Sequence, residues 1–418
     1  MSLKKPAVNL NNITILSIFS LGFLVRIILF RNKNIISLLS NRVEIATTVT
    51  SYKRLKEGLF LYEHGISPYN DNSFHHTPLL LALFSVIRLI SNSQFLVSLL
   101  YTIIDLFSAW FLLDLTNSTI LKDHSINPWM KYFTIFSFLL NPYSIVSCVG
   151  MSTAIFTNCS IFASLSYLQC RKSLQSIFFL AIATYLSFYP ILLLPPLILI
   201  LHKNNTRKTN ISTTKSIILF FAALLLLLLL SFITTGSWDF LSATYGFILL
   251  APDLTPNVGL WWYFFTEIFD SFRLFFTSIF QLHLFIYLAP LCIRLRKYPF
   301  FIIIILCGIM SILKPYPSIA DAVLFMSLFP LLHPIHSYMR YKFATTLCFF
   351  YCSFLGPIFY YLWINAGSGN ANFFYSITLV WNFNLSIIVT DIVFAILKME
   401  LEIEKPDMKG VDVIQINY

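Results

Sequence analysis

A lysine and an aspartate at the two sides of a proline-rich segment are the first candidates for chemistry in this sequence. Lys314 ends an apolar run, and Asp321 follows seven residues later, at a spacing of two helical turns. An acidic side chain within a membrane is costly unless it has a partner, so the two are a candidate ion pair. Lys314 is then either a fixed cation for a phosphate or a side chain that reaches to the membrane surface. A second candidate pair joins Asp105 to Arg26 or Arg88.

Five consecutive aromatic residues at 261–265 are the second feature, and Glu267 and Asp270 follow them. Tryptophan and tyrosine favour the headgroup level of a membrane, where an apolar ring and a polar tip are both satisfied. We therefore expect a helix that lies at the membrane surface, with Trp261 and Trp262 setting its depth. It is either a plain interfacial anchor or one wall of a site for a lipid headgroup.

Three further polar positions have two interpretations each. Glu44 has the residue type of a general base, but no second acid is near it, which favours a solvated side chain paired with a nearby cation. The candidates for that cation are Lys53, Arg54 and Lys56. His75 and His76 are adjacent, and because neighbouring side chains diverge, hydrogen bonding is favoured over joint metal ligation.

A small polar turn at 367–372 separates two apolar runs. Its glycines allow backbone N–H groups to approach an anionic headgroup, and Asn370 and Asn372 can donate to sugar or phosphate oxygens. The alternative is a plain turn. The sequence contains no phosphate-binding loop, HExxH or GxSxG motif, and its seven cysteines show no CxxC spacing. We predict neither a metal nor a cofactor.

The amino-acid composition indicates which kind of secondary structure positions these residues. The 418 residues are 57% hydrophobic and 11% charged, with a mean hydropathy of +0.77. Apolar runs near 20 residues long recur throughout, which is typical of an all-α polytopic membrane protein. The net charge of +10 comes from short basic clusters beside apolar runs, which indicates contact with membrane lipids and excludes a nucleic-acid-binding protein.

We predict one membrane-embedded helical domain, 1–418, with about twelve spans. These are 13–30, 77–90, 94–114, 131–148, 152–169, 174–201, 216–235, 272–293, 299–313, 319–335, 343–364 and 373–397. Lysines before the first span place the N-terminus, and with twelve spans also the tail 398–418, in the cytosol. The loops 31–76 and 236–271 and the turns 314–318 and 365–372 are then all lumenal, although loop 31–76 is itself basic.

Several segments resemble the fungal form of the PIG-U family, a polytopic subunit of the glycosylphosphatidylinositol (GPI) transamidase, and they follow one another along the chain as in that family. The most specific are NVGLWWYFFTEIFD at 257–270 and GSGNANFFY at 367–375. The others are 44–47, 51–58, 67–69, 75–79, 189–193 and KPYPS at 314–318. They extend across nearly the whole chain.

This resemblance implies a multi-pass protein of the endoplasmic reticulum membrane that binds and presents the GPI glycolipid without catalysing its transfer. Its partners are then a catalytic cysteine subunit and three further membrane subunits. The family is also similar in fold to the GPI mannosyltransferases, which implies a glycosyltransferase-C-like bundle with interfacial lumenal helices. The alternative function is a mannosyltransferase that uses a lipid-linked sugar, with Glu44 as its acid. Those enzymes carry an acid pair where this sequence has Glu44 alone. The candidate GPI-binding residues are Asn370, Asn372, Lys314, Trp261, Trp262, Asp321, Glu44, His75 and His76.

Overall fold

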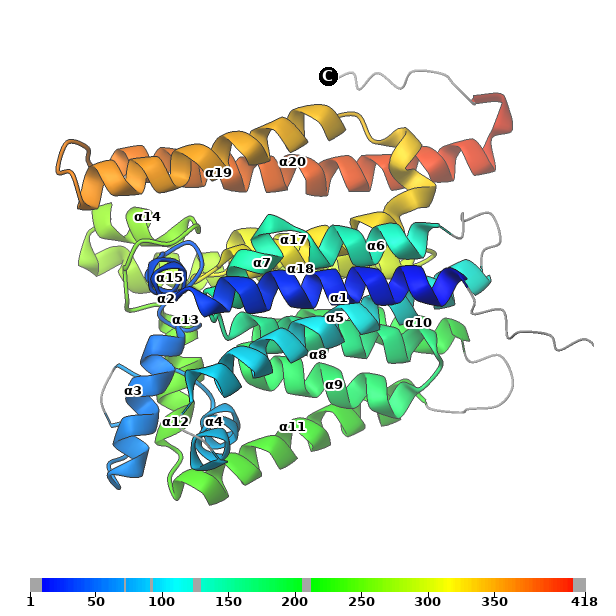
Figure 1. Cartoon of the computed structure of the whole chain (residues 1–418). Helices are drawn as coiled ribbons and strands as arrows, with labels where there is room; N and C mark the ends of the chain where they lie inside the picture. Colours follow the sequence, from blue (N-terminus) through cyan, green and yellow to red (C-terminus); the bar gives the residue numbers. More distant parts are fainter. Residues whose placement is uncertain (1–9, 71–72, 91–92, 123–128, 205–211, 409–418) are drawn as a thin grey trace, which may run out of the picture. The chain divides into compact units, whose positions relative to one another are not determined.

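The computed structural model describes residues 10–70, 73–90, 93–122, 129–204 and 212–408, and nearly all of its regular structure is helical (Figure 1). Within these residues the β structure is an isolated antiparallel bridge between Ser51 and Ser152. The chain divides into two compact units, 1–330 and 331–418, which are described separately below. The prediction of an all-helical protein is confirmed.

The first unit opens with α1 (Leu10–Arg31), α2 (Lys33–Ser40), α3 (Tyr52–Glu63), α4 (Pro78–Ile90) and α5 (Gln94–Lys122). The middle of the unit contains α6 (Met130–Leu139), α7 (Pro142–Val149), α8 (Ala154–Gln169), α9 (Ser173–Ser187), η1 (Tyr189–Leu193), α10 (Leu194–Asn204) and α11 (Thr213–Thr235). It continues with α12 (Asp239–Leu241), η2 (Ser242–Gly246), α13 (Phe247–Leu250), α14 (Trp261–Glu267), α15 (Asp270–Ile286), α16 (Leu288–Arg294), α17 (Pro299–Leu313) and α18 (Ile319–Ser327). The helix η3 (Phe329–Tyr338) leads into the second unit.

Six helical segments of the described residues are long and apolar enough to cross a membrane. They are Ile13–Arg31, Gln94–Thr119, Thr213–Thr235, Asp270–Arg294, Lys342–Ile364 and Ala371–Glu404. Two bent pairs raise the number to eight if each pair forms one span: α6 with α7, bent by 44°, and α18 with η3, bent by 64°. Asn141 caps α7 and Pro142 begins it, which places the first bend at the predicted kink. The chain is therefore a multi-pass membrane protein, and its described residues contain six to eight candidate spans by length and composition.

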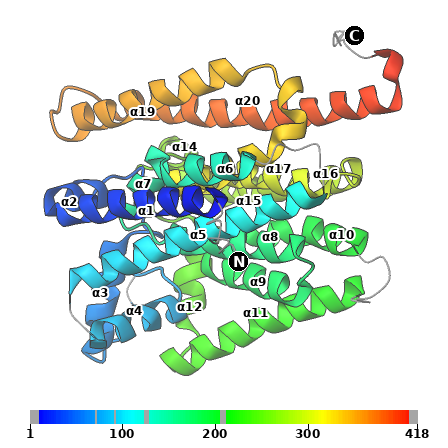
Figure 2. The same cartoon turned by 45° about the vertical axis from the view of Figure 1, so that its right-hand side comes forward.

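Two predicted spans have a different arrangement in the structure. The segment 77–90 is α4, a helix of 13 residues that is too short to cross the hydrocarbon core upright. Figure 1 shows α4 almost end-on, whereas α1, α5, α8, α9 and α11 run across the picture, and Figure 2 shows the same crossing from another direction. Because α4 lies across one end of these helices, the helices α2 and α3 and the described residues around α4 stay at that end.

The predicted span 174–201 is interrupted after α9. Phe188 has a φ of 59°, and the short helix η1 follows it. The helix α10 then runs back toward the end at which α9 began, and it finishes close to the start of α11 (Figure 1). The two differences affect the predicted span count in opposite directions: α4 is short for a span, and 174–201 contains two helices rather than one.

A buried ion pair joins α1 to its neighbours in the first unit. Arg26 is fully buried, and its Nε donates to Asp105 Oδ2 at 2.6 Å. Its Nη1 donates to the carbonyl oxygens of Gly22 and Leu139, and its Nη2 donates to Ser144 Oγ. Arg26 thus links α1 to α5, α6 and α7. The pairing that the sequence suggested is present.

The second unit contains all but the first two residues of η3, followed by α19 (Lys342–Ile364), α20 (Ala371–Glu404) and η4 (Pro406–Met408). Asp391 accepts hydrogen bonds from the backbone N–H groups of Arg340, at 3.0 Å, and Tyr341, at 3.2 Å, which precede α19. Asn384 Nδ2 donates to Thr345 O at 3.1 Å. These bonds hold the start of α19 against α20. The predicted tail 398–418 begins within α20, and residues 409–418 lie outside the described part.

Candidate functional site

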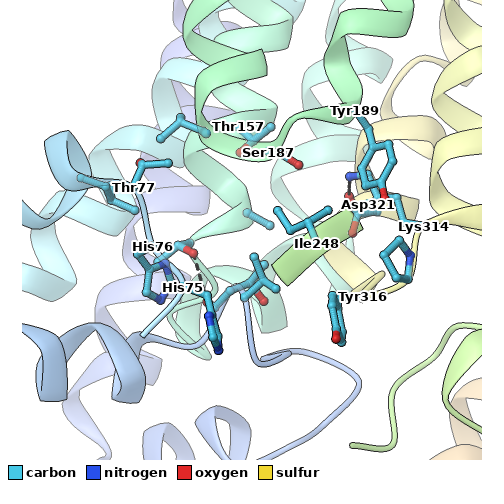
Figure 3. Close-up of a pocket in the computed structure, with 17 residues that line it drawn as sticks. His75, His76, Thr77, Thr157, Ser187, Tyr189, Ile248, Lys314, Tyr316 and Asp321 are labelled. Carbon is cyan, nitrogen blue, oxygen red and sulfur yellow. Dashed lines mark hydrogen bonds and ion pairs between the residues drawn. The ribbon is translucent and has the colours of Figure 1, made fainter. Parts of the chain in front are cut away.

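A small polar cavity of about 50 Å³ opens among loop segments at one end of the first unit. A buried water molecule needs roughly 10–15 Å³, so the cavity has room for a few waters or a small polar group. Its walls come from segments around Thr50, His76, Thr157, Tyr189 and Lys314 (Figure 3). These segments are far apart in the sequence, so the cavity exists only in the folded chain.

One wall of the cavity contains the predicted ion pair. Lys314 Nζ lies 2.5 Å from Asp321 Oδ1, and both side chains are about nine-tenths buried. The second carboxylate oxygen accepts hydrogen bonds from Ser318 N at 2.9 Å and Ser318 Oγ at 3.3 Å. Asp321 thereby also completes the capping box at the start of α18. The pairing of Lys314 with Asp321 is confirmed.

The two histidines lie on the opposite side of the cavity (Figure 3). His76 Nε2 is 3.0 Å from Ser51 O, and His75 Nδ1 is 2.8 Å from Ala243 O. Because a carbonyl oxygen only accepts, each of these nitrogens carries the proton and donates it. Burial lowers the pKa of His76 to about 4, so its ring is neutral near pH 7. Among the described residues, no cluster of three or more metal-ligating side chains is present.

The aromatic stretch packs against the loop that carries Lys314. Trp261 and Trp262 are 2% and 3% exposed, and Trp261 Nε1 donates to Leu313 O at 2.9 Å. The expectation that these tryptophans face the headgroup level is therefore wrong for this chain: both pack inside the protein. The predicted continuous surface helix is also interrupted, because α14 ends at Glu267 and α15 begins at Asp270.

Asn257 and Gly259 fix the contact between this stretch and the loop 314–318. Asn257 Oδ1 accepts from Gly259 N at 2.7 Å, and Asn257 Nδ2 donates to Pro315 O at 3.4 Å. A Cβ atom on Gly259 would lie 2.7 Å from Pro317. Only glycine fits this close approach without displacing the loop.

Glu44 is buried and does not line the cavity. Neither of its carboxylate oxygens has a hydrogen-bond partner among the described residues, and burial raises the pKa of the side chain. The predicted pairing with a nearby lysine or arginine is wrong: Lys53 bonds to Asn41, and Arg54 lies 3.7 Å from Asp253. The backbone carbonyl of Glu44 accepts from Ile319 N at 2.9 Å, so Glu44 contacts the start of α18 through its main chain.

Asn370 and Asn372 belong to the second unit, where both are exposed. Asn370 is the N-cap of α20, and its Oδ1 accepts from Asn372 N at 3.1 Å. Gly367 has a φ of 63°, and the N–H groups of Ser368 and Gly369 both bond to Leu362 O. The turn therefore has a local structural role, and its contact with a lipid headgroup stays a prediction.

Tyr189 and Tyr316 line the cavity but were not among the predicted site residues. Tyr189 Oη donates to Gln281 Oε1 at 2.9 Å, and Tyr316 Oη donates to Asp253 O at 3.0 Å. Phe247 stacks on both His75 and Tyr316, with ring centroids 3.5 and 5.3 Å apart. Both tyrosines are next to a proline, and both lie in segments that resemble the PIG-U family, 189–193 and 314–318. Their place in these segments was the signal by which the sequence could have identified them as site residues.

These features define a class: a helical, multi-pass membrane protein with a small polar cavity that contains an internally neutralised ion pair. The chain belongs to the PIG-U family, because the family model described as GPI transamidase subunit PIG-U matches residues 20–381.

Curated relatives cover nearly the whole chain. The GPI-anchor transamidase component PIGU of Mus musculus is 37% identical over 403 residues, which are 90% of this chain and 92% of the relative. The GPI transamidase component GAB1 of Saccharomyces cerevisiae is 38% identical over 372 residues, 89% of this chain and 91% of the relative. The GAB1 homolog of Schizosaccharomyces pombe is 30% identical over 404 residues, with 96% and 98% covered.

Proposed function

We propose that this chain is a non-catalytic subunit of the GPI transamidase complex, which binds the GPI glycolipid and presents it for attachment to the C-terminus of precursor proteins. The observation that carries the proposal is that the carboxylate of Asp321, in the cavity wall, is already bonded within the protein. Asp321 is occupied by Lys314 and Ser318, so it is poorly placed to act as a general base. A site of this kind favours binding over proton transfer.

The cavity and its surroundings suit a phosphorylated glycan. Lys314 is paired with Asp321, but its ammonium group has further N–H groups that can donate at the wall, and neutral His76 has a second ring nitrogen that accepts hydrogen bonds. A wider groove of about 410 Å³ shares His75 with the cavity and is also lined by Arg54 and Asp253. The headgroup is then held partly in the cavity and partly in this groove.

The topology that accompanies this function has twelve spans and a glycosyltransferase-C-like bundle in the endoplasmic reticulum membrane. The spans are α1, α5, α6 with α7, α8, α9, η1 with α10, α11, α15 with α16, α17, α18 with η3, α19 and α20. The helix α4 lies on the lumenal surface. This assignment moves Arg171 and Lys172 into a cytosolic loop, in keeping with the excess of basic residues in such loops. An engineered glycosylation sequon beside Gly65 is expected to be modified, whereas one beside Lys172 is not.

The test of GPI binding is purification of the full-length chain from native membranes, with identification of the chains and lipids that accompany it. We expect a catalytic cysteine subunit, three further membrane subunits and GPI. The double variant Lys314→Met/Asp321→Asn, which leaves no unpaired charge at this position, is expected to reduce the GPI recovered while the partner chains remain. Recovery of the chain alone and without GPI would overturn the proposal.

The alternative, a mannosyltransferase that uses a lipid-linked sugar, requires a catalytic acid, and Glu44 was its candidate. The burial of Glu44 away from the cavity argues against that role. Glu44→Gln separates the two functions. The transferase requires loss of sugar transfer in this variant, whereas the presenting subunit transfers no sugar even as wild type.

A further inference from the structure

A second hollow lies where α3, α4 and the beginning of α5 meet. It is an open groove of about 360 Å³, lined by Tyr52, Lys56, Leu59, Phe84, Arg88 and Gln94 among others. None of the residues that line it also lines the cavity at Lys314. The groove therefore needs an explanation of its own, separate from the GPI-presenting role.

The rim of the groove is cationic. Lys56 is exposed, and its Nζ has no hydrogen-bond or ion-pair partner in the part of the chain that the structure describes. Arg88 bonds through Nε to Glu63 Oε1 at 3.1 Å, and each side chain stays about one-third exposed. The two Nη groups of Arg88 face no other acid among the described residues. The rim thus offers two cations against one acid, which favours an anionic ligand.

The floor of the groove is apolar, and its surroundings face lipid. Leu59 and Phe84 are buried at its base. Beyond the rim, Leu89, Ile90 and Phe95 are 86%, 74% and 59% exposed, which suits side chains that contact acyl chains rather than water.

The groove lies at the beginning of a helix that is long and apolar enough to span a membrane. The part of α5 that is long and apolar enough to cross a membrane begins at Gln94, and Gln94 itself lines the groove. A span begins where the hydrocarbon core meets the headgroup layer. With Gln94 as the start of the span, we infer that the cations of the rim are at the level of lipid phosphates and that the exposed apolar residues extend toward the acyl chains.

We propose that this groove binds the phosphate of an anionic membrane phospholipid such as phosphatidylserine, between Lys56 and Arg88, with the acyl chains on the exposed surface of α4 and the start of α5. Charge complementarity, the apolar floor and the depth of Gln94 support one occupant that combines a phosphate with acyl chains. The site is distinct from the one assigned to GPI, and its test uses no GPI.

The experiment titrates the full-length chain in detergent, together with any chains that copurify, with palmitoyl-oleoyl phosphatidylserine, and native mass spectrometry counts the bound lipid. A basic side chain near a membrane surface contributes about 1 kcal/mol to the binding of anionic lipid, so Lys56→Gln and Arg88→Gln are each expected to raise Kd about five-fold, and the double variant about 30-fold. Lys215→Gln, which removes an exposed lysine near the start of α11, is the matched control and is expected to leave Kd unchanged.

Glu63→Gln keeps the test decisive if a loss-of-charge variant folds poorly. Removing the acid that pairs with Arg88 is expected to lower Kd for phosphatidylserine by about two- to five-fold. Equal Kd values for the wild type and the Lys56/Arg88 double variant would overturn the site. So would phosphatidylcholine binding as tightly as phosphatidylserine. If glycerol phosphate competes as strongly as the intact lipid, the ligand is a free phosphate, and the assignment to a phospholipid is overturned.

Discussion

Lys314 Nζ lies 2.5 Å from Asp321 Oδ1 although two prolines stand between these residues in the sequence. The helix α17 ends at Leu313, and Lys314 is extended, with ψ near 148°. The helix α18 then begins at Ile319, so the loop turns the chain and brings its two charged ends together. Neither charge is left alone in the cavity wall.

This pairing predicts strong coupling between the two residues. Lys314→Met and Asp321→Asn are each expected to destabilise the protein by about 3–5 kcal/mol, because each leaves the other charge buried without its partner. The double variant is expected to recover a large part of this loss. The measurement is a double-mutant cycle from reversible unfolding in detergent, and simple additivity of the two single effects would contradict the coupling.

The close approach at Gly259 predicts a specific effect of one methyl group. Gly259→Ala places a Cβ 2.7 Å from Pro317 and 2.8 Å from Asn257 Oδ1, so it is expected to cost about 1–3 kcal/mol and to shift the loop that carries Lys314. Gly246→Ala is the control, because its Cβ would meet nothing closer than 3.7 Å. Unfolding midpoints of the two variants provide the comparison, and equal midpoints would count against the tight contact.

The Lys314–Asp321 pair could be predicted because both its spacing and the cost of an unpaired acid are visible in the sequence. The role of α4 could not, because an apolar run of this length has the same composition whether it crosses a membrane or lies on it. The burial of Trp261 was missed for a similar reason: an indole satisfies its N–H at a headgroup or at a backbone carbonyl, here that of Leu313. The cavity joins Thr50 to Thr157 and Lys314, and such contacts depend on tertiary packing.

Neutral His76 predicts a pH dependence of stability. Burial lowers its folded-state pKa to about 4 from 6.5, so between these values unfolding takes up a proton. The contribution of neutral His76 to the free energy of unfolding is fully present above pH 6.5 and is lost as the pH falls toward 4. At pH 5 the loss is about 2 kcal/mol.

His76→Gln isolates this effect, because the glutamine amide can replace the bond to Ser51 O without titrating. The difference in unfolding free energy between the wild type and this variant, measured from pH 7.5 to 5, is expected to move in favour of the variant as the pH falls, by about 2 kcal/mol. A difference that stays constant over this range would show that the ring is not held neutral by burial.

Substitutions of Asn370 can separate its role as the N-cap of α20 from its predicted contact with GPI. Asn370→Ala removes the N-cap of α20 and is expected to cost about 1 kcal/mol of stability, whereas Asn370→Ser keeps a capping oxygen and changes stability little. If the Asn370 amide donates to GPI, both variants lose GPI recovered from native membranes, and so does Asn370→Lys, while the partner chains still copurify. GPI recovery that falls with alanine but stays at the wild-type level with serine would assign Asn370 to capping alone.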